Sequence, residues 1–332
     1  MALKVLADKQ GLSAVVLDGI DKLNTNTPNS TNELPLQMKL EWIGEVLQNY
    51  EQRYKTYEEA IGSLAGFYNS HSYKMMVLKG YACSLDWPNP MHRPCGDIDI
   101  WQFEKQKEAD FVMQKETGSE IDDSHEHHTI FDWNGFMVEN HYDFIDVHHR
   151  KSSSELERVF KKLGNDDSIS VEISGEKVYL PSPNLHALFL LRHMMEHFSS
   201  TELTLRQLLD WAFFVEKHGK DVDWEWLEGV LKEYGMLPAY AVFNAICVDD
   251  LGFWSEMFRL TQYNPILKER VFNDILSPEF QGIEPKAFIP RIVFKYRRWK
   301  ANGWKNELCF KESMWSAFWS GVWGHLLKPK TI

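Results

Sequence analysis

The spacing of hydrophobic and polar residues divides the chain into a mixed first part and a helical second part. Up to about residue 180, apolar runs are short and are bounded by turn residues. After Pro183, apolar residues recur at helical spacing in three segments, 185–198, 203–219 and 222–235. We therefore expect an α+β domain followed by a mainly α-helical domain, with further helices towards the C-terminus.

The clearest local signal is a hairpin centred on Asn134-Gly135. Asn-Gly between two segments of alternating β-forming residues is typical of a two-residue hairpin turn. This turn predicts the register, with Trp133 opposite Phe136, Ile130 opposite Glu139 and His128 opposite His141. Because side chains alternate along a strand, Glu139, His141 and Asp143 are expected on one face of the hairpin.

The remaining pattern predicts the other elements of the first part. A polar linker over 24–36 contains Ser30 and Glu33 at capping-box spacing, and an amphipathic helix is expected from about 37 to 70. The other expected elements are strands at 73–78 and 96–103, helices at 81–87 and 104–117, and a hairpin at 168–181. We expect an N-terminal helix and linker over 1–36, a catalytic domain over 37–180, and a helical domain over 181–332 that forms the other wall of a cleft.

Composition and charge narrow the class of protein. The net charge of −12 disfavours a protein that coats nucleic acid, although a local basic patch such as KYRRWKANGWK (295–305) leaves nucleic acid open as a partner. The four scattered cysteines fit a reducing compartment. The N-terminus lacks a signal-peptide pattern and no apolar stretch reaches the roughly 20 residues needed to span a bilayer. We expect a soluble, cytoplasmic protein with no membrane partner.

The stretch HRPCGDIDIW (92–101) carries the strongest chemical signal. Alternation on a strand turns Asp97 and Asp99 to one side while Ile98 and Ile100 enter the core. Two carboxylates this close repel each other unless a cation lies between them, and Mg²⁺ prefers such oxygen ligands. Glu139 on a neighbouring strand is the candidate third carboxylate, with Asp143 as its rival. The alternative is a solvent-facing polar strand edge.

A candidate phosphate-binding turn precedes the aspartates. The order of a strand, then Lys79-Gly80, then a helix start allows close approach of phosphate to the backbone and offers free N–H groups. Ser84 is positioned to add a hydroxyl, and Arg93 is able to pair with phosphate oxygens. A surface lysine and a structural salt bridge of Arg93 to an aspartate are the alternatives.

These motifs together resemble a known superfamily. The strings LKG (78–80), GDIDIW (96–101) and VENH (138–141), with Arg93 between the first two, resemble the nucleotidyltransferases of the DNA polymerase β type. They are most similar to a bacterial branch of uncharacterised nucleotidyltransferases. The usual Gly-Gly or Gly-Ser pair of that superfamily is Lys79-Gly80-Tyr81 here, with serine only at position 84.

The resemblance implies a fold, a reaction and a set of site residues. It implies a nucleotidyltransferase-like mixed sheet flanked by helices. It also implies transfer of a nucleoside monophosphate from a nucleoside triphosphate such as ATP to an acceptor hydroxyl, with Mg²⁺ or Mn²⁺ as cofactor and pyrophosphate as product. The implied roles are metal binding and catalysis by Asp97, Asp99 and Glu139, and triphosphate contact by Lys79, Gly80, Ser84 and Arg93.

Two other functions remain open at this point. One is a degenerate module that binds a nucleotide without turnover, and the other is a metal-dependent phosphohydrolase that uses the same carboxylates. The acceptor is not readable from the sequence, although the acidic charge favours a small molecule or a protein.

Histidines offer a competing metal chemistry. Six histidines lie between positions 125 and 149, namely His125, His127, His128, His141, His148 and His149. Strand alternation sends them to both faces of the hairpin, so we expect no zinc site there, with His128 or His141 lining the carboxylate pocket instead. His193, Glu196 and His197 match an inverted zinc-protease spacing, but they lie in a strongly apolar helix and are expected to pack or to face substrate.

Overall fold

A computed structural model of the chain describes residues 2–26, 34–125, 127–147, 150 and 152–312. The chain divides into two compact units. Unit 1 comprises residues Met1–Tyr142 and Gly164–Ser182, and unit 2 comprises Asp143–Leu163 and Pro183–Ile332. Ser30 and Glu33, the predicted capping pair, lie outside the described residues. None of the described helices combines the length and the apolar character required to cross a bilayer.

Unit 1 is built on a six-stranded mixed sheet with the strand order β3-β4-β2-β1-β6-β5. The strands are β1 (Met76–Val77), β2 (Ile98–Trp101), β3 (His128–Trp133), β4 (Phe136–His141), β5 (Ser168–Ile173) and β6 (Glu176–Pro181). β1 is antiparallel to β2 and parallel to β6, whereas β2 is parallel to β4. The two hairpins β3-β4 and β5-β6 therefore lie at opposite ends of the sheet.

The predicted register of the first hairpin is confirmed. Trp133 pairs with Phe136, Ile130 with Glu139 and His128 with His141. The turn places Asn134 at φ 51° and Gly135 at φ 78°. Both values are in the left-handed region that a type I′ turn requires, which is why Asn-Gly is favoured at this point.

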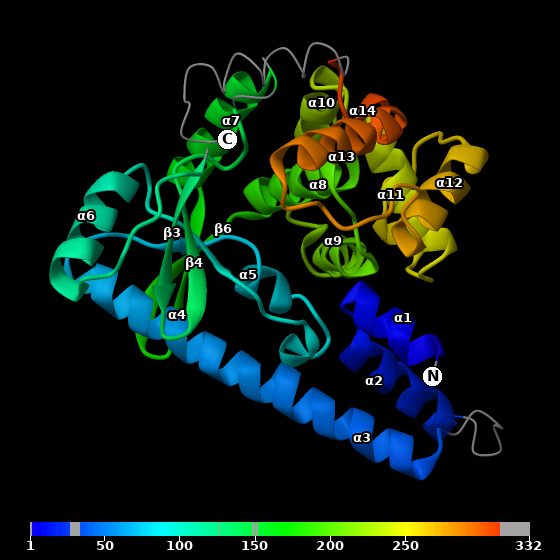
Figure 1. The fold of residues 1–332 in the computed structure, drawn as a ribbon, viewed down its shortest axis with the longest axis horizontal. Coiled ribbons are helices and arrows are strands. Elements are labelled where there is room, and N and C mark those ends of the chain that lie inside the picture. The colour runs from blue at the N-terminus through cyan, green and yellow to red at the C-terminus, as the bar shows by residue number, and fades with distance from the viewer. Residues whose placement is uncertain (1, 27–33, 126, 148–149, 151, 313–332) are drawn as a thin grey trace. The chain divides into compact units, whose positions relative to one another are not determined.

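The helices of unit 1 begin with α1 (Ala2–Gln10) and α2 (Ser13–Asn26). They continue with α3 (Leu36–Val46), the π-helix η1 (Leu47–Gln52) and α4 (Arg53–Ser70), which follow one another directly and confirm the helix predicted over 37–70 (Figure 1). Shorter elements are α5 (Tyr81–Ser84) and the 3₁₀ turn η2 (Pro90–His92), and α6 (Gln106–Thr117) lies in the segment predicted as 104–117.

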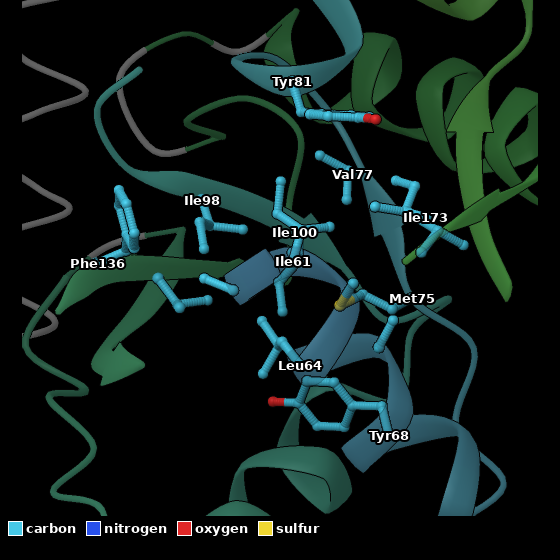
Figure 2. Packing of buried hydrophobic residues seen from close by; sticks show 14 of the residues in the cluster. Ile61, Leu64, Tyr68, Met75, Val77, Tyr81, Ile98, Ile100, Phe136 and Ile173 are labelled. Carbon is cyan, nitrogen blue, oxygen red and sulfur yellow. The ribbon is translucent and has the colours of Figure 1, made fainter. Parts of the chain in front are cut away.

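The core of unit 1 lies between α4 and one face of the sheet. Ile61 and Leu64 of α4 pack with Val77, Ile98 and Ile100 of the central strands, and all five side chains are fully buried (Figure 2). The inward position of Ile98 and Ile100 confirms the predicted alternation on β2. Asp99 lies between these two residues on β2, so its side chain points away from this core.

The first predicted strand is shorter than expected. The sequence predicts residues 73–78, but only Met76–Val77 form β1. The pairing with β2 nevertheless continues one residue further, because the Leu78 backbone N–H donates to the Asp99 carbonyl at 3.0 Å. Gly80 then adopts φ 59° and ψ −98°, a conformation that ends the strand and begins α5.

The helices of unit 2 confirm the expected helical second part. They are α8 (Pro183–Ser200), α9 (Leu205–His218), α10 (Trp224–Glu233), α11 (Leu237–Asp249), the 3₁₀ turn η3 (Ser255–Met257), α12 (Pro265–Leu276), α13 (Phe288–Ala301) and α14 (Gly303–Cys309). Helix α7 (Ser153–Asp166), which begins in unit 2, is not among the elements expected from the sequence. Its Leu156 and Phe160 are buried.

Candidate active site

Two of the three acidic residues of the predicted site, Asp99 and Glu139, meet through parallel pairing of two strands. Asp97, expected on the same strand as Asp99, instead precedes β2 and is not in the group of close ligand atoms. β2 and β4 lie side by side with Asp99 opposite Glu139 and Trp101 opposite His141. Because side chains alternate, Asp99, Glu139 and His141 lie on the sheet face opposite the α4 core. Their ligand atoms all lie within 4.8 Å of one another. From the sequence, Glu139 was expected near the aspartates. The parallel register of β2 and β4 brings it opposite Asp99.

Asp99 is a buried carboxylate held between the Lys79 ammonium and the His141 imidazole. It is 1% exposed, and its Oδ1 lies 2.8 Å from Lys79 Nζ and 3.0 Å from His141 Nε2. His141 Nε2 also lies 3.4 Å from Glu139 Oε2. A buried charge is tolerated when it is paired and hydrogen-bonded, so Lys79 and His141 are what allow Asp99 to remain ionised.

The proton equilibria of these groups follow from this arrangement. Burial favours the neutral acid, but Lys79 and His141 outweigh it and hold the pKa of Asp99 below its usual range. Burial likewise opposes ionisation of Glu139, whose pKa is nevertheless lowered by its hydrogen bond with His141. For His141, burial is outweighed by hydrogen bonds to the two carboxylates, and the pKa of the imidazole is raised. The cluster therefore concentrates ionised groups in a poorly solvated place.

Asp97 lies in the loop that leads into β2. Its pKa is raised, first by burial and then by the negative charge of Asp99, with Lys79 opposing. Two residues of the long helix fix the loop. The Tyr57 hydroxyl donates to the Asp97 carbonyl at 2.8 Å, and Arg53 Nε donates to the Cys95 carbonyl at 3.1 Å. The aspartate loop is thus held by α4 as well as by the sheet.

Gly80 is required at its position for two reasons. Its φ of 59° is rarely adopted by residues with a side chain. A Cβ at this position would also lie 2.5 Å from the Tyr57 hydroxyl oxygen, the same hydroxyl that holds Asp97. Gly80 and the aspartate loop therefore depend on one common contact.

The other two predicted phosphate-contact residues have partners within the protein. Ser84 is fully buried, and its hydroxyl donates to the Tyr81 carbonyl at 2.7 Å and shares a 3.0 Å hydrogen bond with the Tyr54 hydroxyl. Arg93 is 5% exposed, and its Nη1 donates to the Pro94 carbonyl at 3.2 Å. In this arrangement Ser84 fixes α5 against α4 and has no hydroxyl hydrogen bond left to offer a triphosphate.

The histidines are arranged differently from the expectation of separate faces. His127, His128 and His141 come together, with one ligand nitrogen from each within 4.8 Å of the others. Alternation does hold from His128 onwards, but His127 precedes β3, where the rule does not apply. The Asn134-Gly135 turn already predicted that His128 pairs with His141 across the strands. That pairing was the feature of the sequence from which the histidine cluster could have been found.

The pKa of His128 is lowered to about 3, first by burial and then by the neighbouring His141. Its Nε2 lies 4.0 Å from Glu139 Oε1. His128 therefore carries a neutral imidazole at neutral pH, beside the carboxylates of the candidate site, as its expected position lining the pocket implies.

The second histidine pattern shows a packed arrangement. The rings of His193 and His197 on α8 are 4.3 Å apart, and Glu196 between them pairs with Arg192 at 2.7 Å. Among the described residues, neither histidine belongs to a group of three possible metal ligands. The spacing therefore reflects an edge-to-face contact of the two rings on one helix face, in line with the expectation that they pack.

Most of the chain matches a known protein family. A family described as uncharacterised nucleotidyltransferase matches residues 2–249, and the chain belongs to this family, as the resemblance implied. A solved structure, the crystal structure of an antigenic nucleotidyltransferase-like protein from Paracoccidioides brasiliensis, is similar with 17% identity and a TM-score of 0.34. That match covers 48% of this chain and 75% of the other. No curated protein sequence matches the chain.

Proposed function

We propose that the chain is a metal-dependent nucleotidyltransferase that moves a nucleoside monophosphate from a nucleoside triphosphate to an acceptor hydroxyl and releases pyrophosphate. The observation that carries the proposal is the parallel register of β2 and β4, which sets Asp99 opposite Glu139 with Lys79 2.8 Å from Asp99. Family membership supports the same reaction class.

The donor set fits a hard divalent cation. Asp97, Asp99 and Glu139 supply carboxylate oxygens, which Mg²⁺ and Mn²⁺ prefer, and these three residues would hold the ion. Burial is the main cause of the raised pKa of Asp97, and the negative charge of Asp99 adds to it; a cation bound between the two carboxylates would relieve that repulsion. Bound there, the ion would supply Lewis-acid stabilisation of charge on the transferring phosphoryl group.

The residues of the chain then have separate roles. The Lys79 ammonium now neutralises Asp99, and with nucleotide bound it would pair with the triphosphate oxygens instead. The backbone beside Gly80 offers close approach to phosphate because no Cβ blocks it. Glu139, with 16% of its side chain exposed, is the carboxylate that would accept the proton of the acceptor hydroxyl. Arg93 would stabilise the leaving pyrophosphate.

The acceptor is proposed to be a small molecule or a protein. The net charge of −12 would repel a polyanionic acceptor at long range, which disfavours RNA or DNA. The helical unit would select the acceptor, and ATP is the first donor to test.

The test is calorimetric titration of each nucleoside triphosphate, with and without Mg²⁺, into wild type and Asp99→Asn. We expect Mg²⁺-dependent binding that weakens by about tenfold or more in the variant, because one carboxylate ligand is lost. The matched control is Glu172→Gln, which removes the same charge at an exposed position on β5.

Product analysis separates the reaction classes. Pyrophosphate together with a nucleotidylated acceptor supports the proposal. Orthophosphate as the sole product would instead identify a phosphohydrolase, and binding without turnover over a broad acceptor panel would identify a binding module. Equal nucleotide binding by wild type and Asp99→Asn would contradict the metal site.

A further inference from the structure

A cluster of three imidazoles lies beside the carboxylates at the end of the β3-β4 hairpin. The ring centroids of His127 and His128 are 4.5 Å apart, those of His128 and His141 are 5.2 Å apart, and those of His127 and His141 are 5.6 Å apart. The backbone holds this arrangement, because the Tyr142 N–H donates to the His127 carbonyl at 3.1 Å and His128 pairs with His141 across the strands.

Two of these imidazoles have a buried nitrogen with no hydrogen-bond partner. Within the described part of the chain, Nδ1 of His128 and Nδ1 of His141 are both buried and unpaired. The side chains of His128 and His141 are only 10% and 3% exposed. Whichever tautomer is present, each ring leaves either an N–H donor or a lone pair unsatisfied, which is rare for buried polar atoms. When Nε2 carries the proton, Nδ1 presents the lone pair that a metal ion binds.

The opposite nitrogens of the same two rings face carboxylates. His141 Nε2 lies 3.0 Å from Asp99 Oδ1, and His128 Nε2 lies 4.0 Å from Glu139 Oε1. For His141, a carboxylate hydrogen-bonded to one nitrogen is the arrangement that orients a histidine whose other nitrogen binds a metal, because it fixes the tautomer and raises the basicity of the ring. The 4.0 Å separation at His128 is longer than a hydrogen bond.

We propose that His127, His128 and His141 bind one transition-metal ion of the zinc class, at a site separate from the Mg²⁺ or Mn²⁺ of the proposed transferase reaction. Imidazole nitrogens favour Zn²⁺, Co²⁺ and Ni²⁺, whereas Mg²⁺ prefers oxygen. Three protein nitrogens leave a fourth coordination position open for water or another small ligand. The ion would also fix the end of β4, which carries Glu139. The proposal does not depend on nucleotide transfer.

The test uses Co²⁺ as a spectroscopic substitute for Zn²⁺, added to the full chain after metal removal and without a polyhistidine tag. We expect one equivalent of Co²⁺ to bind with the visible absorption of a four-coordinate site, and Zn²⁺ to displace it while excess Mg²⁺ does not. His127→Ala should weaken Co²⁺ binding by about tenfold or more. The matched control is His71→Ala, which removes an exposed imidazole at the end of α4 and should leave Co²⁺ binding unchanged.

A second variant replaces the His127 imidazole by a thiolate, whose bond to Co²⁺ adds a new absorption band. His127→Cys should bind Co²⁺ with a near-ultraviolet thiolate-to-cobalt absorption that wild type, with its own four cysteines, does not show. Co²⁺ binding that is indifferent to His127→Ala, or a His127→Cys protein with no new absorption, would overturn the proposal. Because no nucleotide is present, these results are independent of whether the transferase reaction is found.

Discussion

Lys79 and a divalent cation would compete for the same carboxylate. In the described structure, the Lys79 ammonium lies 2.8 Å from Asp99, whose other contact is the His141 imidazole at 3.0 Å. Burial opposes the charge on Lys79, yet Asp99 and Glu139 raise the pKa of the ammonium. A cation bound by Asp99 must therefore displace the ammonium or share the carboxylate with it.

Lys79→Met should separate metal binding from nucleotide binding. We expect Mg²⁺ or Mn²⁺ without nucleotide to bind about tenfold more tightly, because a positive charge next to Asp99 is removed. Nucleoside triphosphate should bind more weakly, because a phosphate partner is lost. Titration calorimetry measures both quantities, and Lys79→Arg, which keeps the charge, is the control. Weaker metal binding in Lys79→Met would contradict this account.

A second prediction at the scale of single residues concerns the contact between Gly80 and Tyr57. Gly80→Ala should lower the free energy of unfolding through its positive φ, about 1–3 kcal/mol, and further through the 2.5 Å approach of Cβ to the Tyr57 hydroxyl. Tyr57→Phe alone should cost about 1 kcal/mol for the lost hydrogen bond to Asp97.

In the double variant Gly80→Ala/Tyr57→Phe the clash is removed and only the φ strain remains, since the next contacts of the added Cβ are at 3.5 Å and 3.7 Å. Urea denaturation of the four proteins should therefore give a total loss smaller than the sum of the two single losses. Strict additivity would show that the hydroxyl does not restrict position 80.

At the scale of elements, the hairpin was predictable and the central sheet was not. Asn134-Gly135 determines its own register locally, so the His128–His141 and Ile130–Glu139 pairs followed from the sequence. The parallel pairing of β2 with β4 joins strands separated by α6, and no local pattern fixes which residue lies opposite Asp99. The carboxylates were thus identified by type and spacing, whereas Lys79 and His141 as partners of Asp99 required the fold.

Helix α6 shares apolar core packing with the hairpin and is also hydrogen-bonded to it through one buried acid. Asp110 accepts a hydrogen bond from the Thr129 hydroxyl at 2.8 Å and another from the Asn140 amide at 2.8 Å. Asp110→Ala leaves both donors unpaired inside the protein, so the free energy of unfolding should fall by about 2–5 kcal/mol. Urea denaturation measures this loss, with exposed Glu108→Ala on the same helix as the control. A loss no larger than that of the control would show that solvent replaces Asp110.

At the scale of the whole molecule, the change from mixed to helical pattern near residue 180 corresponds to the second of two places where the chain leaves unit 1. The first is after Tyr142, and the segment Asp143–Leu163 belongs to unit 2 before the chain returns to β5. The sequence does not indicate that this segment belongs to unit 2, because a single amphipathic helix is able to pack in either unit. Which unit buries its apolar face is a tertiary property, and α7 was missed for the same reason.

Glu157 on α7 makes the stability of unit 2 depend on pH. It is 4% exposed, and burial raises the pKa of its carboxyl from 4.5 to about 8, although it accepts hydrogen bonds from the Phe144 and Ile145 N–H groups at 3.0 Å and 3.1 Å. The folded protein therefore holds a proton that the unfolded chain releases near pH 4.5. Its stabilising contribution is complete below that pH and is lost as the pH rises through about 8.

Between these limits the free energy of unfolding of unit 2 should fall by up to about 1.4 kcal/mol per pH unit. Differential scanning calorimetry from pH 5 to pH 8 should show a transition whose midpoint falls as pH rises. In Glu157→Gln the midpoint should no longer fall with rising pH, because the amide does not titrate. The transition whose pH dependence disappears is then assigned to the unfolding of unit 2. The control Glu155→Gln, exposed on the same helix, should keep the dependence. An unchanged slope in Glu157→Gln would assign the pH dependence to another group.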